Sequence, residues 1–464
     1  MKATGAVDAV DVVALGESMV TFLPTRPGRL ADVPSFDRAI GGAESNVACA
    51  LAAAGHTVRW VSRVGADGFG DHLVETIGAH GVDVSSVGRD PARPTGVYFR
   101  TAGDRATDAH EVAYYRAGSA ASAMSAATVD LAAVRAGRIL HLSGITAALS
   151  EGCLELLREL TASAGGGRPV VSFDVNYRAG LWAGSAGAGV LLDLARRADL
   201  VFVGEDEAEQ AWGVTGGPTA IRELLPEPEV LVVKQAAAGA TAFVSAAARW
   251  GLVAQFPAPL TGRSSAASRT TAPDSPRPDD ASSAVGASSA VDALSPANAT
   301  SAVDALGPAN APSAVDAPSA VDALSPADAP SPAGSLSCGQ SCRWGGTGGR
   351  SGTLAAPVSV PTPRPAGTFE PAPAVDVVAT VGAGDAFAAG FLSGVLRGLP
   401  VGQMLRLGHL FAAAALTTPA DLAPPPGRDT TDRLTALDTG AWERLRLGPG
   451  WTEADAAEEE VRTP

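Results

Sequence analysis

The chain has 464 residues, of which 46% are hydrophobic, and its formal net charge at pH 7 is -15. This length allows one large α/β domain with additions, or two or three ordinary domains. An acidic protein repels nucleic acid and anionic membrane, so we expect neither as a partner. The first residues lack a signal-peptide core, and no stretch has the roughly 18 uninterrupted apolar residues of a membrane span, so we expect a cytoplasmic protein.

The first half of the chain alternates short apolar runs with helical patterns. The runs predict strands at Val10–Leu15, Val58–Val64, Arg138–Leu142, Val170–Val175, Leu200–Val203 and Val230–Val233. Helical periodicity predicts helices at Ala43–Ala54, Asp71–His80, Glu151–Leu160 and Leu191–Arg197. Several strands are apolar on both faces, which is typical of a parallel sheet covered by helices on both sides. The pattern predicts a doubly wound α/β domain with a mainly parallel sheet.

Two stretches interrupt this alternation. Thr95–Thr101 and His110–Arg116 alternate apolar and polar residues, with Gly103 and Asp104 between them. This arrangement is typical of an antiparallel hairpin and not of a βαβ unit. We therefore expect a small β-sheet lid at about residues 95–117, set apart from the main sheet.

Residues 257–368 differ abruptly in composition, being dominated by Ser, Ala, Pro, Asp and Thr. The phrase Ser-Ala-Val-Asp-Ala recurs, beginning at Ser289, Ser301, Ser313 and Ser319. Such a segment buries too little apolar surface to offset the entropy of ordering, so we predict a disordered insertion. Cys338 and Cys342 lie inside it without further metal ligands nearby, so no metal site is predicted.

Ordered sequence resumes near Phe369. Ala374–Val381 is predicted to be a strand, and Gly384–Arg397 and Gln403–Leu416 are predicted to be helices. Residues 429–464 are polar and acidic, and we expect a tail with at most a short helix.

The strongest local signal for chemistry is the segment from Thr380 to Gly390, TVGAGDAFAAG. Small residues at 382–384 would let backbone amides at a helix N-terminus close on a phosphate. Asp385 at the start of that helix could accept a proton from a substrate hydroxyl, as phosphoryl transfer requires. The pattern alone leaves open a glycine-rich turn with Asp385 as a capping residue.

A second cluster is GGAESN, residues 41–46, where Gly41 and Gly42 precede a helix. Its polar residues could simply cap that helix. Asn46, however, begins an apolar run, and a buried amide there needs a partner such as a sugar hydroxyl.

GGAESN, VGADGFG at 64–70 and GAGDAFAAGF at 382–391 together resemble the PfkB/ribokinase family of sugar kinases, over residues 8–256 and 369–428. The resemblance implies a doubly wound, ribokinase-like domain with a small β-sheet lid. It also implies ATP and Mg2+ as cofactors and a sugar as substrate, and it is compatible with a homo-oligomer.

YYRAGSAAS at 114–122, LSGIT at 142–146 and FDVNYR at 173–178 resemble 2-keto-3-deoxygluconate kinases in particular. By this resemblance Asp385 would be the general base for the C6 hydroxyl, and Gly382, Ala383 and Gly384 would form the anion hole. The implied substrate residues are Gly42, Asn46, Tyr98, Tyr114, Arg116, Arg178 and Asp421. The implied nucleotide residues are Lys234, Gly239 and Glu207.

Other functions stay open. A kinase for a neutral sugar such as fructose or ribose is one alternative, although it would not need Arg116, whose guanidinium suits a carboxylate. A degenerate relative that binds a sugar acid without phosphorylating it is another. The aromatic residues of the hairpin could also do no more than cover the core.

Three departures from the family pattern support the degenerate alternative. Ala379 replaces an Asp that often helps to hold a monovalent cation, so activation by such a cation is left open. Gly204 replaces the Asn of an Asn-x-x-Glu motif. Ala236 replaces a glycine in Lys-x-Gly-x-x-Gly at a position suited to positive φ, so the nucleotide loop is expected to be distorted.

Overall fold

The computed structural model describes residues 7–101, 111–162, 168–182, 186–245, 366–419 and 422–453. The predicted insertion, apart from residues 366–368, lies outside the described residues, as do Cys338, Cys342 and the hairpin turn at Gly103 and Asp104. No helix within the described ranges is long and apolar enough to cross a membrane.

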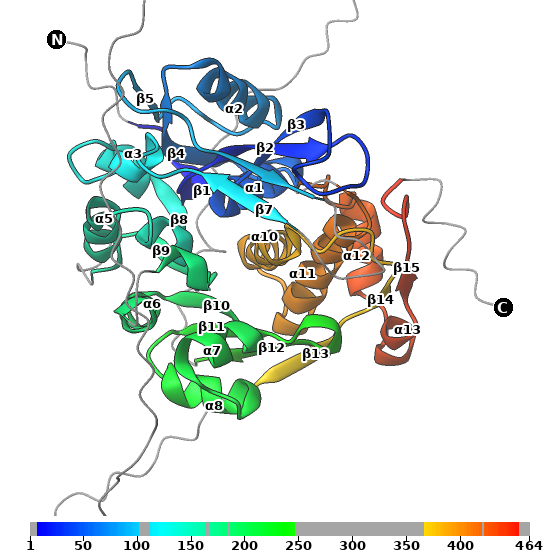
Figure 1. Cartoon of the computed structure of the whole chain (residues 1–464). Coiled ribbons are helices and arrows are strands. Elements are labelled where there is room, and N and C mark those ends of the chain that lie inside the picture. The colour runs from blue at the N-terminus through cyan, green and yellow to red at the C-terminus, as the bar shows by residue number, and fades with distance from the viewer. Residues whose placement is uncertain are drawn as a thin grey trace, which may run out of the picture. The chain divides into compact units, whose positions relative to one another are not determined.

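The core of the fold is a nine-stranded sheet with the order β13-β12-β11-β10-β9-β8-β1-β4-β5 (Figure 1). Its strands are β1 (Val10–Leu15), β4 (Val58–Gly65), β5 (Val87–Asp90), β8 (Gly137–Ser143), β9 (Val170–Asp174), β10 (Leu200–Gly204), β11 (Val230–Lys234), β12 (Gly239–Val244) and β13 (Thr368–Pro371). Strands β11 to β5 are parallel, whereas β12 and β13 add antiparallel pairs at one edge. The predicted, mainly parallel sheet is confirmed, and β12 and β13 bring together the two sides of the predicted insertion.

Helices cover both faces of this sheet. One face carries α1 (Ala43–Ala53), α2 (Gly68–Ala79), α10 (Ala383–Leu396) and α11 (Val401–Leu416). The other carries α3 (Leu131–Arg135), α5 (Glu151–Thr161), α6 (Ala186–Arg197), α7 (Glu205–Trp212) and α8 (Gly217–Leu224), with α4 (Gly144–Ala147) following β8. On β1, Val12 belongs to the first apolar cluster and Val13 to the second. Both faces of a strand are therefore buried, which explains why the strands read as continuous apolar runs.

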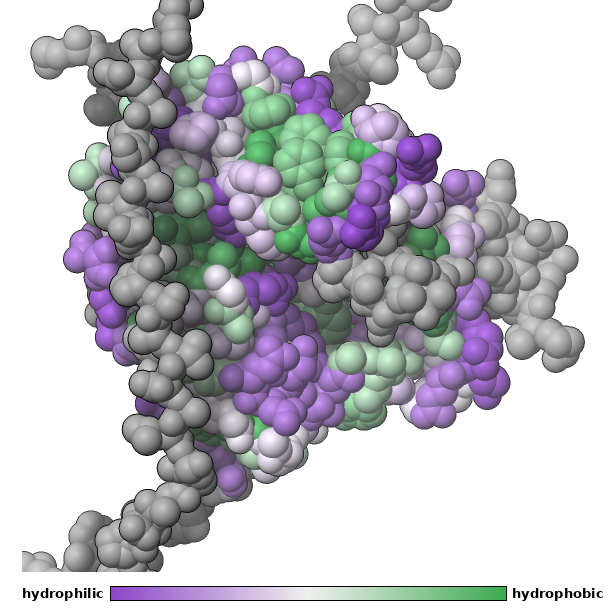
Figure 2. All heavy atoms as spheres, viewed as in Figure 1, coloured by the Kyte–Doolittle hydropathy of each residue, from purple (hydrophilic) through white to green (hydrophobic). Residues whose placement is uncertain are grey.

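The lid is a separate sheet with the order β3-β2-β6-β7. Its strands are β2 (Met19–Pro24), β3 (Phe36–Gly41), β6 (Val97–Arg100) and β7 (Val112–Tyr115). The predicted hairpin is confirmed, since β6 and β7 pair antiparallel with Tyr98 opposite Tyr114. Figure 2 shows an apolar patch over this sheet. Within the sheet, Phe22 of β2 stacks on Phe99 of β6 with 4.8 Å between ring centroids. The sequence missed β2 and β3.

The strand predicted at Ala374–Val381 is corrected, because only β14 (Ala374–Val375) is a strand. It pairs with β15 (Arg446–Leu447) and not with the main sheet. The N–H groups of Val378 and Ala379 both donate to the Leu416 carbonyl, at 2.7 and 3.2 Å. These bonds hold the segment against the end of α11 as an irregular loop.

The predicted acidic tail is also wrong for residues 429–453, which contain α12 (Arg428–Thr435), α13 (Thr439–Glu443) and β15. Trp442 and Trp451 are 0% and 2% exposed and pack with Leu410 of α11 in a third apolar cluster. The guanidinium of Arg406 lies 5.0 Å from the Trp442 ring centroid. A few large aromatic residues therefore anchor a segment whose composition is otherwise polar.

Candidate active site

Four neighbouring parallel strands end at one place on the main sheet. Ser143 of β8 is in register with Asp174 of β9, and Gly204 of β10 is in register with Lys234 of β11. The carboxyl ends of parallel strands are where open α/β sheets bind ligands. Side chains from this edge and from the first turns of α1 and α10 make up the candidate site.

The N-terminus of α10 faces Lys234. Gly382 caps this helix with a φ of 79°, a left-handed conformation that favours glycine. A Cβ on Gly384 would lie 3.6 Å from Lys234 Nζ, so the helix start and the ammonium are neighbours. Free amides, the positive end of the helix dipole and a lysine together suit a phosphate group.

Asp385 lies in the first turn of α10 and is half-buried. Asn46 Nδ2 of α1 donates to Asp385 Oδ2 at 2.9 Å, so the two glycine-rich segments meet across 339 positions of sequence. Burial raises the pKa of Asp385 to about 7, and the charge of Asp174 adds to this, while the Asn46 hydrogen bond and Lys234 oppose it. A carboxylate with a pKa near neutrality suits general-base catalysis.

Lys234 binds Asp174, with Nζ 3.2 Å from Oδ1 and 3.1 Å from Oδ2. Burial lowers the pKa of Lys234, but the carboxylates of Asp174 and Glu207 outweigh burial and raise it. The lysine therefore stays cationic beside the α10 N-terminus. Asp174 is 2% exposed, and the sequence offered one signal for it, a carboxylate closing an apolar strand.

Glu207 links this group to Arg178. Its Oε2 accepts from the Gly204 N–H at 2.8 Å, and its Oε1 lies 3.5 Å from Arg178 Nη1. Burial raises the pKa of Glu207. Gly204, where the resemblance implies an Asn, thus contributes only its backbone to this contact. The Arg178 side chain is 54% exposed, so its guanidinium remains accessible to a ligand.

Arg116, just after β7, forms a close ion pair with Glu17, and the two side chains are 11% and 1% exposed. Ser119 Oγ donates to the other Glu17 oxygen at 2.6 Å. The Arg116 guanidinium is 5.9 Å from the Tyr114 ring centroid. The sequence predicted Arg116 as a ligand residue but missed Glu17, which holds it.

Glu44 is a further buried acid that sequence reasoning placed only as a first-turn residue. Its Oε1 accepts from Ser143 Oγ and Thr146 Oγ1, both at 2.7 Å. Burial raises the pKa of Glu44.

A Cβ on Gly42 would lie 2.5 Å from the Glu17 carbonyl oxygen, so only glycine allows the lid base to approach α1 this closely.

The structure thus joins several predicted residues in one polar group: Asn46, Arg178, Glu207, Lys234, Gly382, Ala383, Gly384 and Asp385. Tyr98 and Tyr114 lie on the lid with 5.5 Å between ring centroids. Asp421 lies outside the described residues.

Gly239, predicted as a nucleotide residue, has a second reason to be glycine. A Cβ there would lie 2.3 Å from the Glu370 carbonyl oxygen, so the contact between β12 and β13 already requires glycine. Ala236, in a short 3-10 helix (Ala236–Ala238), has a φ of 48°. Ala236 therefore adopts the positive φ that favours glycine, and the expected distortion of the loop stays a prediction.

Sequence comparison gives the family. The profile described as pfkB family carbohydrate kinase matches residues 9–257 and 355–426, leaving 258–354 unmatched. The chain is 33% identical over 237 residues to 2-dehydro-3-deoxygluconokinase of Thermoproteus tenax, covering 50% of this chain and 72% of the relative. It is 35% identical to the Bacillus subtilis protein of that name, covering 44% and 63%. Fructokinase-1 of rice (Oryza sativa subsp. japonica) is 32% identical, covering 44% and 62%.

Solved structures agree in fold. The 2-dehydro-3-deoxygluconokinase of Thermotoga maritima has a TM-score of 0.59 at 18% identity, covering 93% of this chain and 100% of that chain. An E. coli protein assigned as ribokinase II, solved with ATP and Mg2+, has a TM-score of 0.59 at 16% identity, covering 91% and 98%. At these identities the likeness shows the fold alone. With the family profile matched on both sides of the unmatched stretch, the chain belongs to the pfkB family of carbohydrate kinases.

Proposed function

We propose that this protein is an ATP-dependent sugar-acid kinase that phosphorylates the C6 hydroxyl of 2-keto-3-deoxygluconate. The observation that carries the proposal is the contact between Asn46 and Asp385 at the α10 N-terminus, beside Lys234. Two relatives that carry the name of this activity support the substrate.

Asp385 is the proposed general base. Asn46 Nδ2 holds Oδ2, which leaves Oδ1 to accept the proton of the substrate hydroxyl. With its pKa raised to about 7, Asp385 is both ionised in a useful fraction and basic enough to take that proton. The hydroxyl oxygen then attacks the γ-phosphorus of ATP, the bond from that phosphorus to the bridging oxygen breaks, and ADP leaves with the electron pair.

Lys234 and the backbone amides of Gly382, Ala383 and Gly384 stabilise the negative charge of the phosphoryl group during its transfer. These groups are fixed before the reaction, so they stabilise negative charge without reorganisation. Lys234 is pinned by Asp174 at 3.1 Å, which limits its movement.

ATP and Mg2+ are proposed by analogy with the family and with the E. coli neighbour solved with both. Among the described residues, no group of three or more His, Cys, Asp or Glu could hold a metal ion alone. Mg2+ would be carried by the phosphates of the nucleotide, and Asp174 and Glu207, which lie beside Lys234, are the acidic residues that would hold it. When bound it neutralises phosphate charge. That Ala379 weakens a monovalent-cation site stays a prediction.

The substrate carboxylate is proposed to bind Arg178 and Arg116, with Tyr98 and Tyr114 covering the sugar acid. Arg178 is the more available, because Arg116 already has Glu17 as a partner. A neutral sugar is the second candidate, favoured by the 32% identity to a rice fructokinase.

A substrate panel with purified full-length protein tests the proposal. Production of ADP is followed by a coupled assay with 2-keto-3-deoxygluconate, 2-keto-3-deoxygalactonate, fructose and ribose, each with ATP and Mg2+. We expect the highest kcat/KM with 2-keto-3-deoxygluconate and the loss of turnover in Asp385→Asn. A higher kcat/KM for fructose would overturn the substrate. A rise in Tm with a sugar acid but no turnover with any sugar would favour the alternative of a relative that binds a sugar acid without phosphorylating it.

Arg178→Gln tests whether Arg178 binds the carboxylate of the substrate and not the rest of the sugar. The expected result is a rise in KM for 2-keto-3-deoxygluconate of about tenfold or more, since a charge-assisted hydrogen bond is lost. Activity on a neutral sugar should change little. An equal loss for acid and neutral substrates would contradict a carboxylate-binding role for Arg178.

A further inference from the structure

A pocket away from the active site is lined by the end of α1, the second half of α10 and the start of α12. Its cavity of about 110 Å³ has an apolar floor made by Ala53, Ala54 and Phe411. Ser393 on its wall comes eight residues after Asp385 on α10, which corresponds to about 12 Å along the helix. The pocket is therefore separate from the proposed catalytic group.

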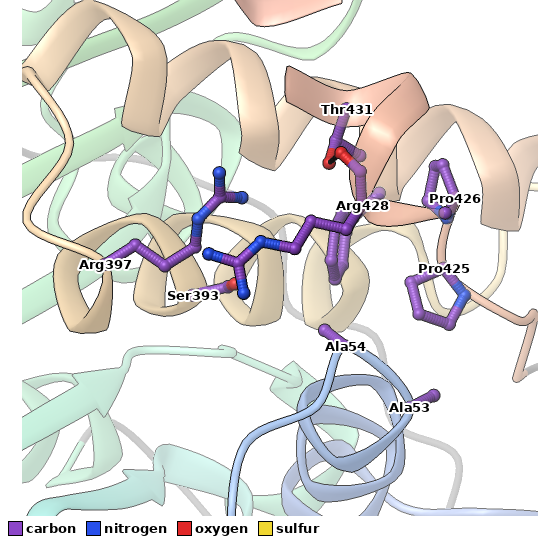
Figure 3. Close-up of a pocket in the computed structure, with 10 residues that line it drawn as sticks. Ala53, Ala54, Ser393, Arg397, Pro425, Pro426, Arg428 and Thr431 are labelled. Carbon is purple, nitrogen blue, oxygen red and sulfur yellow. Dashed lines mark hydrogen bonds between the residues drawn. The ribbon is translucent and has the colours of Figure 1, made fainter. Parts of the chain in front are cut away.

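Two arginines converge at this pocket. Figure 3 shows Arg397 from the end of α10 and Arg428 from the first turn of α12 extending toward one another. Arg397 forms a close ion pair with Asp432, while Arg428 Nε is 3.9 Å from the other Asp432 oxygen. One carboxylate thus serves two guanidinium groups, and the pocket keeps an excess of positive charge in a chain whose net charge is -15.

Two further observations show that positive charge at this pocket is only partly compensated. Arg397 Nε is buried and has no hydrogen-bond partner among the described residues, and the Arg397 side chain is 14% exposed. Asp432 therefore satisfies only part of the Arg397 guanidinium. In addition, Gly427 lines the pocket and caps the eight-residue helix α12, so the positive end of that helix dipole lies at the same place.

His56 contacts a residue of the pocket wall. Its Nε2 lies 2.8 Å from Ser393 Oγ on the pocket wall. Burial lowers the pKa of His56 to about 4, Asp11 opposes this, and Arg397 and Arg428 lower it further. The histidine is therefore neutral near pH 7, so it contributes no charge to the pocket and serves to hold Ser393 in place.

We infer that this pocket binds a phosphate-sized anion between Arg397 and Arg428. Phosphate offers several acceptor oxygens, which suits the terminal N–H groups of two guanidinium forks. The size of the cavity decides between ligands, because about 110 Å³ exceeds a water site but is well below the roughly 300–1,000 Å³ of pockets for whole drug-sized ligands. The ligand is thus inorganic phosphate or the phosphate group of a small monoester whose remainder lies outside.

Isothermal titration calorimetry on the full-length protein tests this inference. Saturating Mg2+ and a non-hydrolysable ATP analogue first fill the catalytic anion site, and inorganic phosphate or 6-phosphogluconate is then titrated. We expect Arg428→Gln to weaken binding of the preferred probe by about tenfold or more. Arg433→Gln, an exposed change on the same helix outside the pocket, should leave affinity within about twofold of the wild type.

Asp432→Asn provides a change of opposite sign. Removing the carboxylate that competes for both arginines should tighten phosphate binding by several-fold, about 0.5–1 logarithmic unit. Tighter binding of inorganic phosphate identifies the free ion as the ligand, and tighter binding of 6-phosphogluconate identifies a monoester. No binding of either probe to the wild type, or equal affinities in wild type and Arg428→Gln, would overturn the inference.

Discussion

Replacing Asp385 with Asn should change how stability depends on pH, independently of any effect on catalysis. Asn keeps the size of the side chain and an oxygen that can accept from Asn46 Nδ2, but it cannot ionise. The folded protein raises the pKa of Asp385 from 3.8 to about 7, chiefly because burial penalises the charged carboxylate. The wild type therefore loses stability when this group ionises, and the variant does not.

The sign and size follow from proton linkage. Between about pH 4 and pH 7 the folded state holds a proton that the unfolded state has released, so the free energy of unfolding falls as pH rises. Each pH unit in this window is worth about 1.4 kcal/mol, so the full difference is about 4 kcal/mol. Because Asp385 is half-buried, solvent screening reduces the expected value to about 2–4 kcal/mol.

Urea unfolding of both proteins at pH 4.5, 5.5, 6.5 and 8 measures this difference. We expect the advantage of Asp385→Asn over the wild type to be smallest at the lowest pH, to grow toward neutrality and to level off above about pH 7. A constant offset between the variants reflects changed contacts and does not affect the argument. An offset that stays the same across all four pH values would refute the raised pKa and, with it, the proposed tuning of the base.

The pH dependence of activity should report the same ionisation of Asp385. We expect kcat/KM to rise as pH increases through about 7, because the base must be ionised. Ala236→Gly should raise the free energy of unfolding by about 1 kcal/mol by relieving its φ of 48°, whereas the matched Ala237→Gly should lower it. Glu17→Gln should lower the free energy of unfolding by about 3 kcal/mol, because the charge of buried Arg116 is left unpaired. The control Glu159→Gln, in an ion pair whose side chains Arg135 and Glu159 are 53% and 43% exposed, should lower it by under about 1 kcal/mol. Urea midpoints check both comparisons.

The main sheet could be predicted because its strands are buried on both faces. In β1, Val12 and Val13 face opposite apolar clusters, so the sequence shows four consecutive apolar residues, Val12–Leu15, between Asp11 and Gly16. The ends predicted for α1 and α2, at Ala54 and His80, lie within one residue of the observed ends, and the glycines that follow, Gly55 and Gly81, have φ values of 91° and 86° that favour glycine. Local chemistry determined these features, and local chemistry is what a single sequence displays.

The lid strands β2 and β3 and the C-terminal segment escaped prediction for one shared reason. Asp37 and Arg38 of β3 are exposed, and Trp442 and Trp451 are single large residues in polar surroundings, so no periodic apolar pattern marks these segments. Their stability comes from tertiary partners, as when Trp442 Nε1 donates to the Pro371 carbonyl across 71 positions. Composition alone described the C-terminal segment as polar, which was correct, and as a tail with at most a short helix, which was not.

The candidate site also contains residues that the sequence could name and residues that only the fold reveals. Asp385 and Asn46 lie in glycine-rich segments whose helix starts are visible in sequence, so both could be named in advance. The pairing of Lys234 with Asp174 joins residues 60 positions apart, and it depends on β9, β10 and β11 being neighbours in register. Once that strand order is known, each carboxyl end has to meet the next, and an apolar strand that closes on Asp or Lys becomes a prediction of a charged pair. Glu17 carries no such local mark, because its role depends on how the lid base approaches Arg116, and only the folded chain displays that approach.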